Sequence, residues 1–165
     1  MFNTIIVSFS FLLLFSAYNS SQNMIGQIYQ QQGYNYLGNI SLFVVYAAFT
    51  ICCLFSPLVI KKVSYKYSIF ISCWGYILFL ASGAIACSCE LNQDLFYCKG
   101  YIITIVNVVC SLLCGFAASV IWPSASAYIS DEAGSTENKE LYFSIFSSCA
   151  LGSQLFGNLS TIVIL

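Results

Sequence analysis

Long apolar runs alternate along this chain with short windows that hold all of its charged side chains. The five Lys and six Asp or Glu residues fall within residues 61–66, 90–99 and 131–140. A membrane-spanning helix needs about 20 apolar residues to cross about 30 Å of hydrocarbon. We therefore predict five transmembrane helices, two of them in the long first run, over approximately residues 4–26, 40–60, 67–87, 101–128 and 141–165.

Turn-forming and helix-ending residues mark the limits of these spans. A polar stretch over residues 27–39, with Gly33 and Gly38, separates the first two spans. Pro57 and Pro123 stand near the ends of the second and fourth spans, where proline suits a helix edge or a kink. Strands that cross a membrane would instead show alternating segments of about ten residues. The pattern predicts an all-α polytopic transmembrane helix bundle that forms one membrane domain over residues 1–165.

The placement of lysine predicts the orientation of the helices. Lys and Arg close to the ends of a span favour the cytoplasmic side, whereas acidic residues contribute little. Residues 61–66 and 131–140 share one face and hold four Lys, and residues 90–99 on the other face hold one. We therefore expect the basic loop of Lys61, Lys62 and Lys66 and the N-terminus to be cytoplasmic. Because no charged segment precedes the first apolar run, we expect that run to be retained as a span rather than cleaved as a signal peptide.

Composition excludes several classes of function. Hydrophobic residues make up 59% of the chain and charged residues 7%, against about 25% charged residues in an average soluble domain. A net charge of −1 gives no basic surface for nucleic acid. The chain has no His, and the predicted spans contain no charged residue, so we find no acid–base pair for catalysis. We expect a non-enzyme without cofactor or metal, whose main partner is the lipid bilayer.

Three of the predicted helices carry uncharged polar residues along one face. An unpaired amide costs several kcal/mol in hydrocarbon, so these faces should turn inward. They can hold helices together, at roughly 0.6 kcal/mol for each hydrogen bond, or they can line a wet cavity. We favour packing for the serines, and both interpretations stay open for the amides of the first and fifth spans. The candidates are Ser16, Asn19, Gln22, Asn23, Asn107, Ser111, Gln154 and Asn158.

The nine Cys residues divide into two groups. Six lie inside predicted spans, where cysteine acts as a small hydrophobic residue. Cys87, Cys89 and Cys98 cluster in the second predicted outer loop, and zinc would need a further ligand that the chain, without His, does not offer. We predict one disulfide, between Cys98 and either Cys87 or Cys89, in an oxidising compartment.

Several short motifs, in the same order along the chain, resemble the Unc-ninety-three family, whose members are called ion channel regulatory proteins. Residues 16–23, Ser-Ala-Tyr-Asn-Ser-Ser-Gln-Asn, resemble its first-helix signature Ser-Ala-Tyr-Asn-Ser-Leu-Gln-Asn. Residues 121–128, Ile-Trp-Pro-Ser-Ala-Ser-Ala-Tyr, are similar to its Leu-Trp-Thr-Ala-Gln-Gly-Ala-Tyr, and this similarity adds Trp122 and Tyr128 to the candidates. Residues 142–146 and 153–158 resemble its fifth-helix pattern, and the Ser-Pro and basic loop after the second span resemble its Ala-Pro and basic loop.

The resemblance implies a major-facilitator architecture of about twelve helices in two halves around a central cavity. In that fold the first, fourth and fifth helices of each half contribute to the cavity, which matches the three polar faces. This chain would then form only part of the N-terminal half, and we expect it to be a fragment. Ala125 and Ser126 stand where the family has Gln and Gly. The basic loop also lacks the Arg and the acidic residue that are typical of major-facilitator transporters.

The resemblance implies a role in regulating or escorting another membrane protein, such as a potassium channel or a receptor. Contacts between helices would carry this role, through Asn19, Gln22, Asn23, Trp122, Tyr128, Gln154 and Asn158. The alternative is a transporter in which the same amides bind a small neutral or polar solute. A four-span junction protein is a third alternative, but it would usually carry its cysteine pair in the first outer loop rather than the second.

Overall fold

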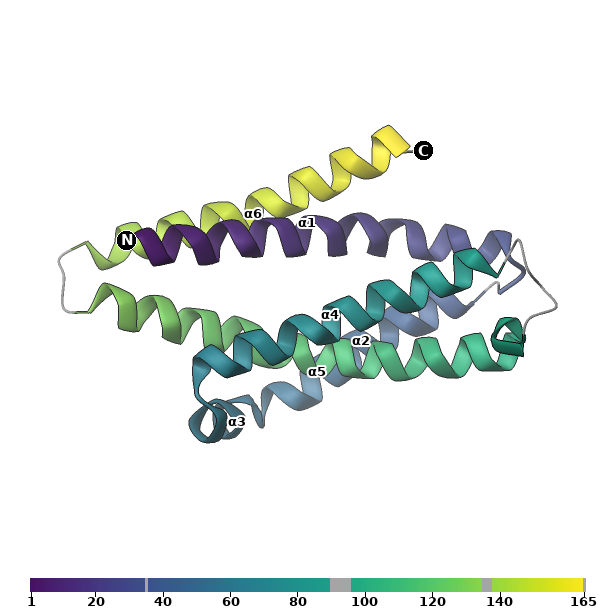
Figure 1. Ribbon diagram of the computed structural model, residues 1–165, viewed down its shortest axis with the longest axis horizontal. Helices are drawn as coiled ribbons and strands as arrows, with labels where there is room; N and C mark the ends of the chain where they lie inside the picture. The colour runs from purple at the N-terminus through teal and green to yellow at the C-terminus, as the bar shows by residue number, and fades with distance from the viewer. Residues whose placement is uncertain (35, 90–95, 135–137, 165) are drawn as a thin grey trace.

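A computed structural model describes residues 1–34, 36–89, 96–134 and 138–164, which form a bundle of long helices without any strand among them (Figure 1). This confirms the predicted all-α fold. The helices are α1 (Phe2–Gln31), α2 (Leu37–Cys53), α3 (Ser56–Val63), α4 (Tyr65–Ser88), the short 3₁₀ helix η1 (Phe96–Cys98), α5 (Gly100–Ala133) and α6 (Lys139–Ile164). Helix α5 packs against α4 and α2, and α6 packs along α1.

Three of the described helices are long and apolar enough to cross a membrane: α1 with 30 residues, α4 with 24 and α5 with 34. At a rise of about 1.5 Å per residue, each exceeds the hydrocarbon thickness. Helices α2 and α3 are long and apolar enough to cross a membrane only when they are taken together, as a pair bent by 69°. Helix α6 has 26 residues, but it is not among the three helices that are long and apolar enough. That it spans the membrane therefore stays a prediction.

Three of the predicted spans differ from the observed helices. The predicted second span, residues 40–60, is not one straight helix, because the chain breaks after Cys53 and α3 starts again with Pro57 in its first turn. Proline favours the first turn of a helix, since it has no N–H to donate. Helix α1 continues to Gln31, into the stretch expected to be a polar loop. Helix α5 continues through Pro123 to Ala133, five residues past the predicted end at residue 128.

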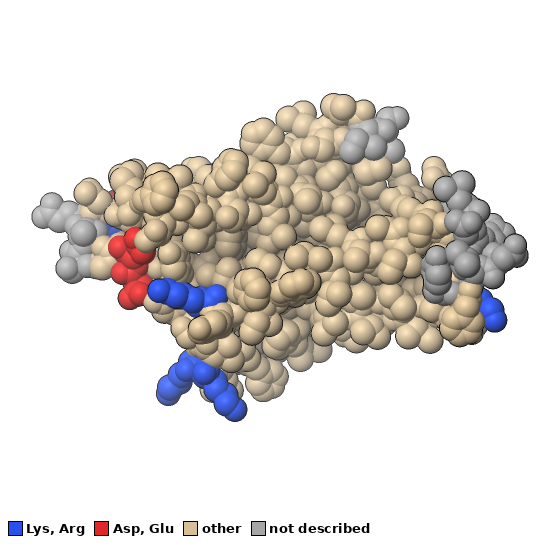
Figure 2. Space-filling view, viewed as in Figure 1, with Lys and Arg blue, Asp and Glu red and all other residues tan. Residues whose placement is uncertain are grey.

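Charged side chains gather at the two ends of the bundle and leave an uncharged surface between them (Figure 2). At one end the Asn3 amide donates to a Glu132 carboxylate oxygen at 3.1 Å, and the N-terminal amine lies 3.8 Å from the same atom. The Tyr65 hydroxyl donates to Asp131 at this end as well. The N-terminus, the start of α4 and the end of α5 therefore meet, as the alternating arrangement requires. We call this the Asp131 end, and the opposite one, at the start of α5, the Lys99 end.

The distribution of side chains between interior and surface is that of a protein surrounded by lipid. Large apolar residues such as Phe43, Phe70 and Leu151 are more than half exposed, at 73%, 65% and 65%. Small polar residues such as Ser8 and Ser119 are fully buried. Water would favour the opposite arrangement, because exposed apolar surface is costly there and not in hydrocarbon.

Candidate functional site

A cavity of about 190 Å³ lies among five helices, α1, α2, α4, α5 and α6. Six of its thirteen lining residues are aromatic, and its polar side chains are three amides, the three tyrosines and Ser153. The lining residues are Phe15, Tyr18, Asn19, Gln22, Val45, Tyr46, Phe49, Tyr76, Ala118, Trp122, Ala150, Ser153 and Gln154. Such a mixture of apolar walls with a few polar groups is typical of sites for small ligands.

The structure brings three of the predicted amides to this cavity. Asn19 and Gln22 lie three residues apart on α1, a spacing that places them on one face of a helix. The Gln22 amide donates a hydrogen bond to the Tyr46 hydroxyl on α2 at 3.0 Å. Gln154 approaches from α6 and is exposed. Asn19, Gln22 and Gln154 therefore line a cavity, as one of the two interpretations left open by the sequence requires.

The other two amides lie at the contact between α1 and α6. The Asn23 side chain donates to the Asn158 side-chain oxygen at 2.7 Å, and both residues are exposed. Directly before Asn158 on α6, Gly157 is so close to α1 that an added Cβ would lie 2.7 Å from the Asn19 Cβ. The Ser16 hydroxyl bonds to a carbonyl of its own helix, the Leu12 oxygen, at 2.6 Å. The geometry here is that of helix packing by small residues and interhelical hydrogen bonds.

Asn107 lies away from this cavity, in a buried hydrogen-bonded cluster that joins four helices. Its side chain is 1% exposed. Its amide nitrogen donates to the hydroxyls of Tyr29 on α1 and Ser82 on α4, the latter at 3.5 Å. Its amide oxygen accepts from the Ser41 hydroxyl on α2. Ser111, one turn further along α5, is also buried, and its hydroxyl has no hydrogen-bond partner among the described residues.

The polar faces predicted from the sequence do not include Tyr29, Ser41 and Ser82, the hydrogen-bond partners of Asn107. Tyr29 falls within residues 27–39, which are predicted to be a polar loop. The spacing of Tyr18, Ile25 and Tyr29, at intervals of seven and four, nevertheless places them on one helix face. Single serines in an apolar run give no signal of this kind. Their pairing depends on which helix faces meet.

Comparison with known proteins finds relatives along nearly the whole chain. UNC93-like protein 3 of Arabidopsis thaliana is 30% identical over 169 residues, which cover 97% of this chain and 32% of that protein. Protein unc-93 homolog A of Homo sapiens is 28% identical over 167 residues, with 95% and 32% covered. The putative potassium channel regulatory protein unc-93 of Caenorhabditis elegans is 30% identical over 132 residues, with 79% and 16% covered. The chain is Unc-93-like.

This result confirms the family resemblance seen in the motifs. Together with the apolar helices, it identifies the chain as a multi-pass membrane protein. The Unc-93-like chain spans about a third of the length of the Arabidopsis and human relatives, at 32% of each. No family model matches it, and no solved structure matches it either, so the major-facilitator architecture stays a prediction.

The two aromatic candidates of the Unc-93-like Trp motif lie in different places. Trp122 lines the cavity and packs on Phe15, Phe11 and Phe146, with ring centroids 4.9, 6.0 and 6.2 Å away. Tyr128 lies towards the Asp131 end, where its ring packs on Tyr65 with centroids 5.9 Å apart. The structure therefore brings Trp122, but not Tyr128, together with the amides of Asn19 and Gln154.

The remaining candidates lie at the ends of the Unc-93-like bundle. Lys61 and Lys62 are in the last turn of α3, and Lys66 follows at the start of α4; all three are exposed. A disulfide joins Cys89 to Cys98 with Cα atoms 5.2 Å apart, so of the two predicted pairings the structure has the one with Cys89. Within the described residues there is no group of three or more His, Cys, Asp or Glu that could hold a metal ion.

Proposed function

We propose that this Unc-93-like chain regulates or escorts another membrane protein through contacts between membrane helices. The observation that carries the proposal is the exposed amide face formed by Asn23 on α1 with Gln154 and Asn158 on α6. These amides lie inside long helices, away from the charged ends. Their mutual hydrogen bond leaves one N–H of Asn23 and the amide nitrogen of Asn158 able to donate further.

Lipid does not satisfy such groups, because hydrocarbon offers no hydrogen-bond acceptors. A helix that presents a hydroxyl, an amide or a free carbonyl would satisfy them and would bind along the same face. The name of the Caenorhabditis elegans relative describes a putative regulator of a potassium channel. We extend that class of partner, a channel or a receptor in the same membrane, to this chain.

The test is co-expression of the chain with a potassium channel, with channel current and surface level as the measurements. Asn23→Leu combined with Asn158→Leu should weaken the effect on the channel, by about threefold for each interhelical hydrogen bond lost. Ser160→Ala is a matched control, because Ser160 is exposed on α6 and its hydroxyl bonds to the Phe156 carbonyl of its own helix. If the double substitution leaves the effect on channel current and surface level unchanged, the amide face does not mediate that effect.

The cavity supports a second candidate function, transport of a small neutral or polar solute. Its volume of about 190 Å³ and its three amides suit a solute of a few heavy atoms without charge. Transporters of several folds hold such sites between helices near the middle of the bilayer. Saturable uptake into liposomes that is abolished by Asn19→Ala would establish transport and defeat the regulatory proposal. Under our proposal, the same liposomes show no saturable uptake.

A further inference from the structure

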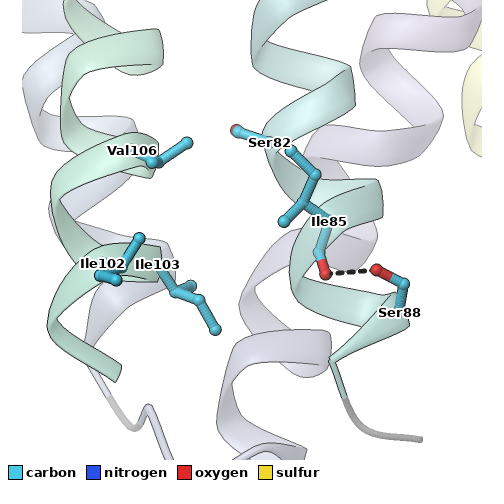
Figure 3. A pocket seen from close by; sticks show the side chains of 6 residues that line it. All are labelled: Ser82, Ile85, Ser88, Ile102, Ile103 and Val106. Atoms are coloured by element: carbon cyan, nitrogen blue, oxygen red, sulfur yellow. Dashed lines mark hydrogen bonds between the residues drawn. The ribbon is translucent and has the colours of Figure 1, made fainter. Parts of the chain in front are cut away.

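The opening between α4 and α5 near the Lys99 end, with a volume of about 370 Å³, offers no free hydrogen-bond donor from its lining side chains (Figure 3). Its two serines already donate to carbonyls of their own helix, Ser82 to Phe79 and Ser88 to Ile85. Its other lining residues are Ile and Val. The strongest nucleophiles in the helices are instead the thiols, and two of these stand next to each other at the end of α2.

Cys52 and Cys53 are the last two residues of α2, and neither takes part in a disulfide. Both side chains are half-buried. The predicted span over residues 40–60 places them inside a straight membrane helix. In the structure, however, α2 ends at Cys53 and the chain bends by 69° into α3. The two thiols therefore lie at a bend of the backbone.

This bend lies close to the edge of the hydrocarbon on the side of the Asp131 end. Tyr34, three residues before α2, lies beside the start of α5 at the Lys99 end, where an added Cβ on Gly100 would lie 3.2 Å from its ring. From there α2 runs for 17 residues. At about 1.5 Å per residue it covers about 25 Å of a hydrocarbon layer about 30 Å thick. Its last turn therefore reaches the opposite boundary.

Helix α3 marks the same boundary. Lys61 and Lys62 are exposed in its last turn, and charged groups avoid hydrocarbon. Leu54 and Leu58, just before α3 and within it, are exposed apolar side chains. Figure 1 shows α3 turned across the long axis of the bundle. Apolar side chains and lysines on a helix in this orientation are typical of a segment that lies in the membrane interface.

The other cysteines outside the disulfide lie at different depths. Cys73 is the ninth residue of α4, about 12 Å beyond the start of that helix, and Cys149 is the eleventh residue of α6. Cys110 and Cys114 lie inside α5. Cys87 lies at the Lys99 end, close to the disulfide. Depth thus separates the adjacent pair at the end of α2 from the other thiols.

We propose that Cys52 and Cys53 are S-acylated by a long-chain fatty acid, with an acyl-coenzyme A as the donor. They lie on the side that the lysine residues predict to be cytoplasmic, and cysteines beside the membrane or on amphipathic helices are acceptors of this reversible modification. The cysteine sulfur attacks the thioester carbonyl. A new S–C bond forms, the C–S bond to coenzyme A breaks, and the thiol proton passes to the released coenzyme A. The reaction needs no oxidant or reductant.

The attached chain enters the leaflet beside the exposed side chain of Leu54. A protein that already crosses the bilayer several times gains little from one more anchor. The acyl chain therefore acts locally, and it holds the bend between α2 and α3 in the membrane interface. This modification is independent of the amide face proposed above, because that face belongs to α1 and α6.

The test is metabolic labelling of cells that express the full chain, with an alkyne analogue of palmitic acid. The purified protein should carry the label, and neutral hydroxylamine, which cleaves thioesters, should release it. Cys52→Ser combined with Cys53→Ser should lower the labelling by about tenfold or more, because it removes both acceptors. Cys73→Ser is the matched control, since Cys73 is also half-buried but lies deeper in the bilayer. It should leave the labelling unchanged.

Two cysteines introduced into the double variant test the role of depth. Leu54→Cys, at a position 77% exposed in the bend, should restore the label. Phe43→Cys should not, because Phe43 is 73% exposed but lies ten residues before Cys53 on α2, about 15 Å further into the bilayer.

Mass spectrometry of the unsubstituted protein gives a result that does not depend on how any variant folds. The peptide that contains residues 52 and 53 should carry the mass of the acyl group. The proposal fails if that peptide is found only without an acyl group, or if the label resists hydroxylamine. It fails equally if the double variant keeps its label, or if Phe43→Cys restores labelling as well as Leu54→Cys does.

Discussion

Asn107 and Tyr29 are joined by a hydrogen bond from the asparagine amide to the tyrosine hydroxyl, across the interface of α5 and α1. Their side chains are 1% and 0% exposed, respectively. The same amide group reaches Ser41 on α2 and Ser82 on α4, so one side chain links four helices. In a bundle without a hydrophobic driving force between helices, a satisfied polar group of this kind favours one arrangement over others.

Asn107→Leu should destabilise the bundle by about 1–3 kcal/mol, because it leaves the Tyr29 hydroxyl buried without its partner. Unfolding in mixed micelles with increasing SDS measures the change. Thr104→Val on the same helix is the control, since the Thr104 hydroxyl bonds to the Gly100 carbonyl of its own helix. The double variant with Tyr29→Phe should lose less than the sum of the two single variants, and strict additivity would contradict the direct link.

Gly115→Ala should destabilise the contact of α2 with α5. An added Cβ would lie 2.7 Å from the Ala48 Cβ and would overlap the Val45 carbonyl oxygen, so the helices must separate. Overpacking of this kind costs about 1–3 kcal/mol. Gly26→Ala is the opposite case, because nothing lies within 4 Å of its added Cβ. In the same SDS titration it should be neutral or stabilising by up to about 1 kcal/mol.

The Cys89–Cys98 disulfide should be detectable by alkylation and mass spectrometry. Two cysteines should react only after reduction, and tandem spectra should place them at Cys89 and Cys98. The bond closes a short loop across a sequence separation of nine, for which the chain-entropy estimate is about 2.5 kcal/mol of stability. Cys98→Ser should lose that stability, and Cys87→Ser should keep the bond. Complete labelling without reductant would show that the bond is absent.

The alternating arrangement predicts that Lys61 and Lys99 lie on opposite sides of the membrane. In a background without other reactive thiols, Lys61→Cys should react with a membrane-impermeant maleimide only when the cytoplasmic side is accessible. Lys99→Cys should react only from the other side, because the charged windows mark the two aqueous boundaries. Modification of both positions from one side would contradict the number of crossings between them.

The part of the fold that the sequence predicts well is the part that depends on one helix and its solvent. Helix α4, at Tyr65–Ser88, lies within two residues of the predicted span 67–87. Charged residues cannot enter hydrocarbon cheaply, so the charged windows set the ends of such helices whatever their neighbours are. Helix α1 departs from this rule at residues 27–31, where its polar residues continue the helix beyond the predicted span. Here local polarity indicated a loop, and the packing of Tyr29 against Asn107 favours the helix.

From the amino-acid sequence alone follow the lipid environment, the all-α architecture, the two charged ends and the family, because composition, charge spacing and short motifs are properties of consecutive residues. Tertiary structure alone decides that Asn19, Gln22 and Gln154 share a cavity, that Asn23 pairs with Asn158, and that Cys98 pairs with Cys89. These relationships depend on the rotation and approach of separate helices. Close contacts at Gly75, Gly115 and Gly157 set that approach, and their partners lie far away along the chain.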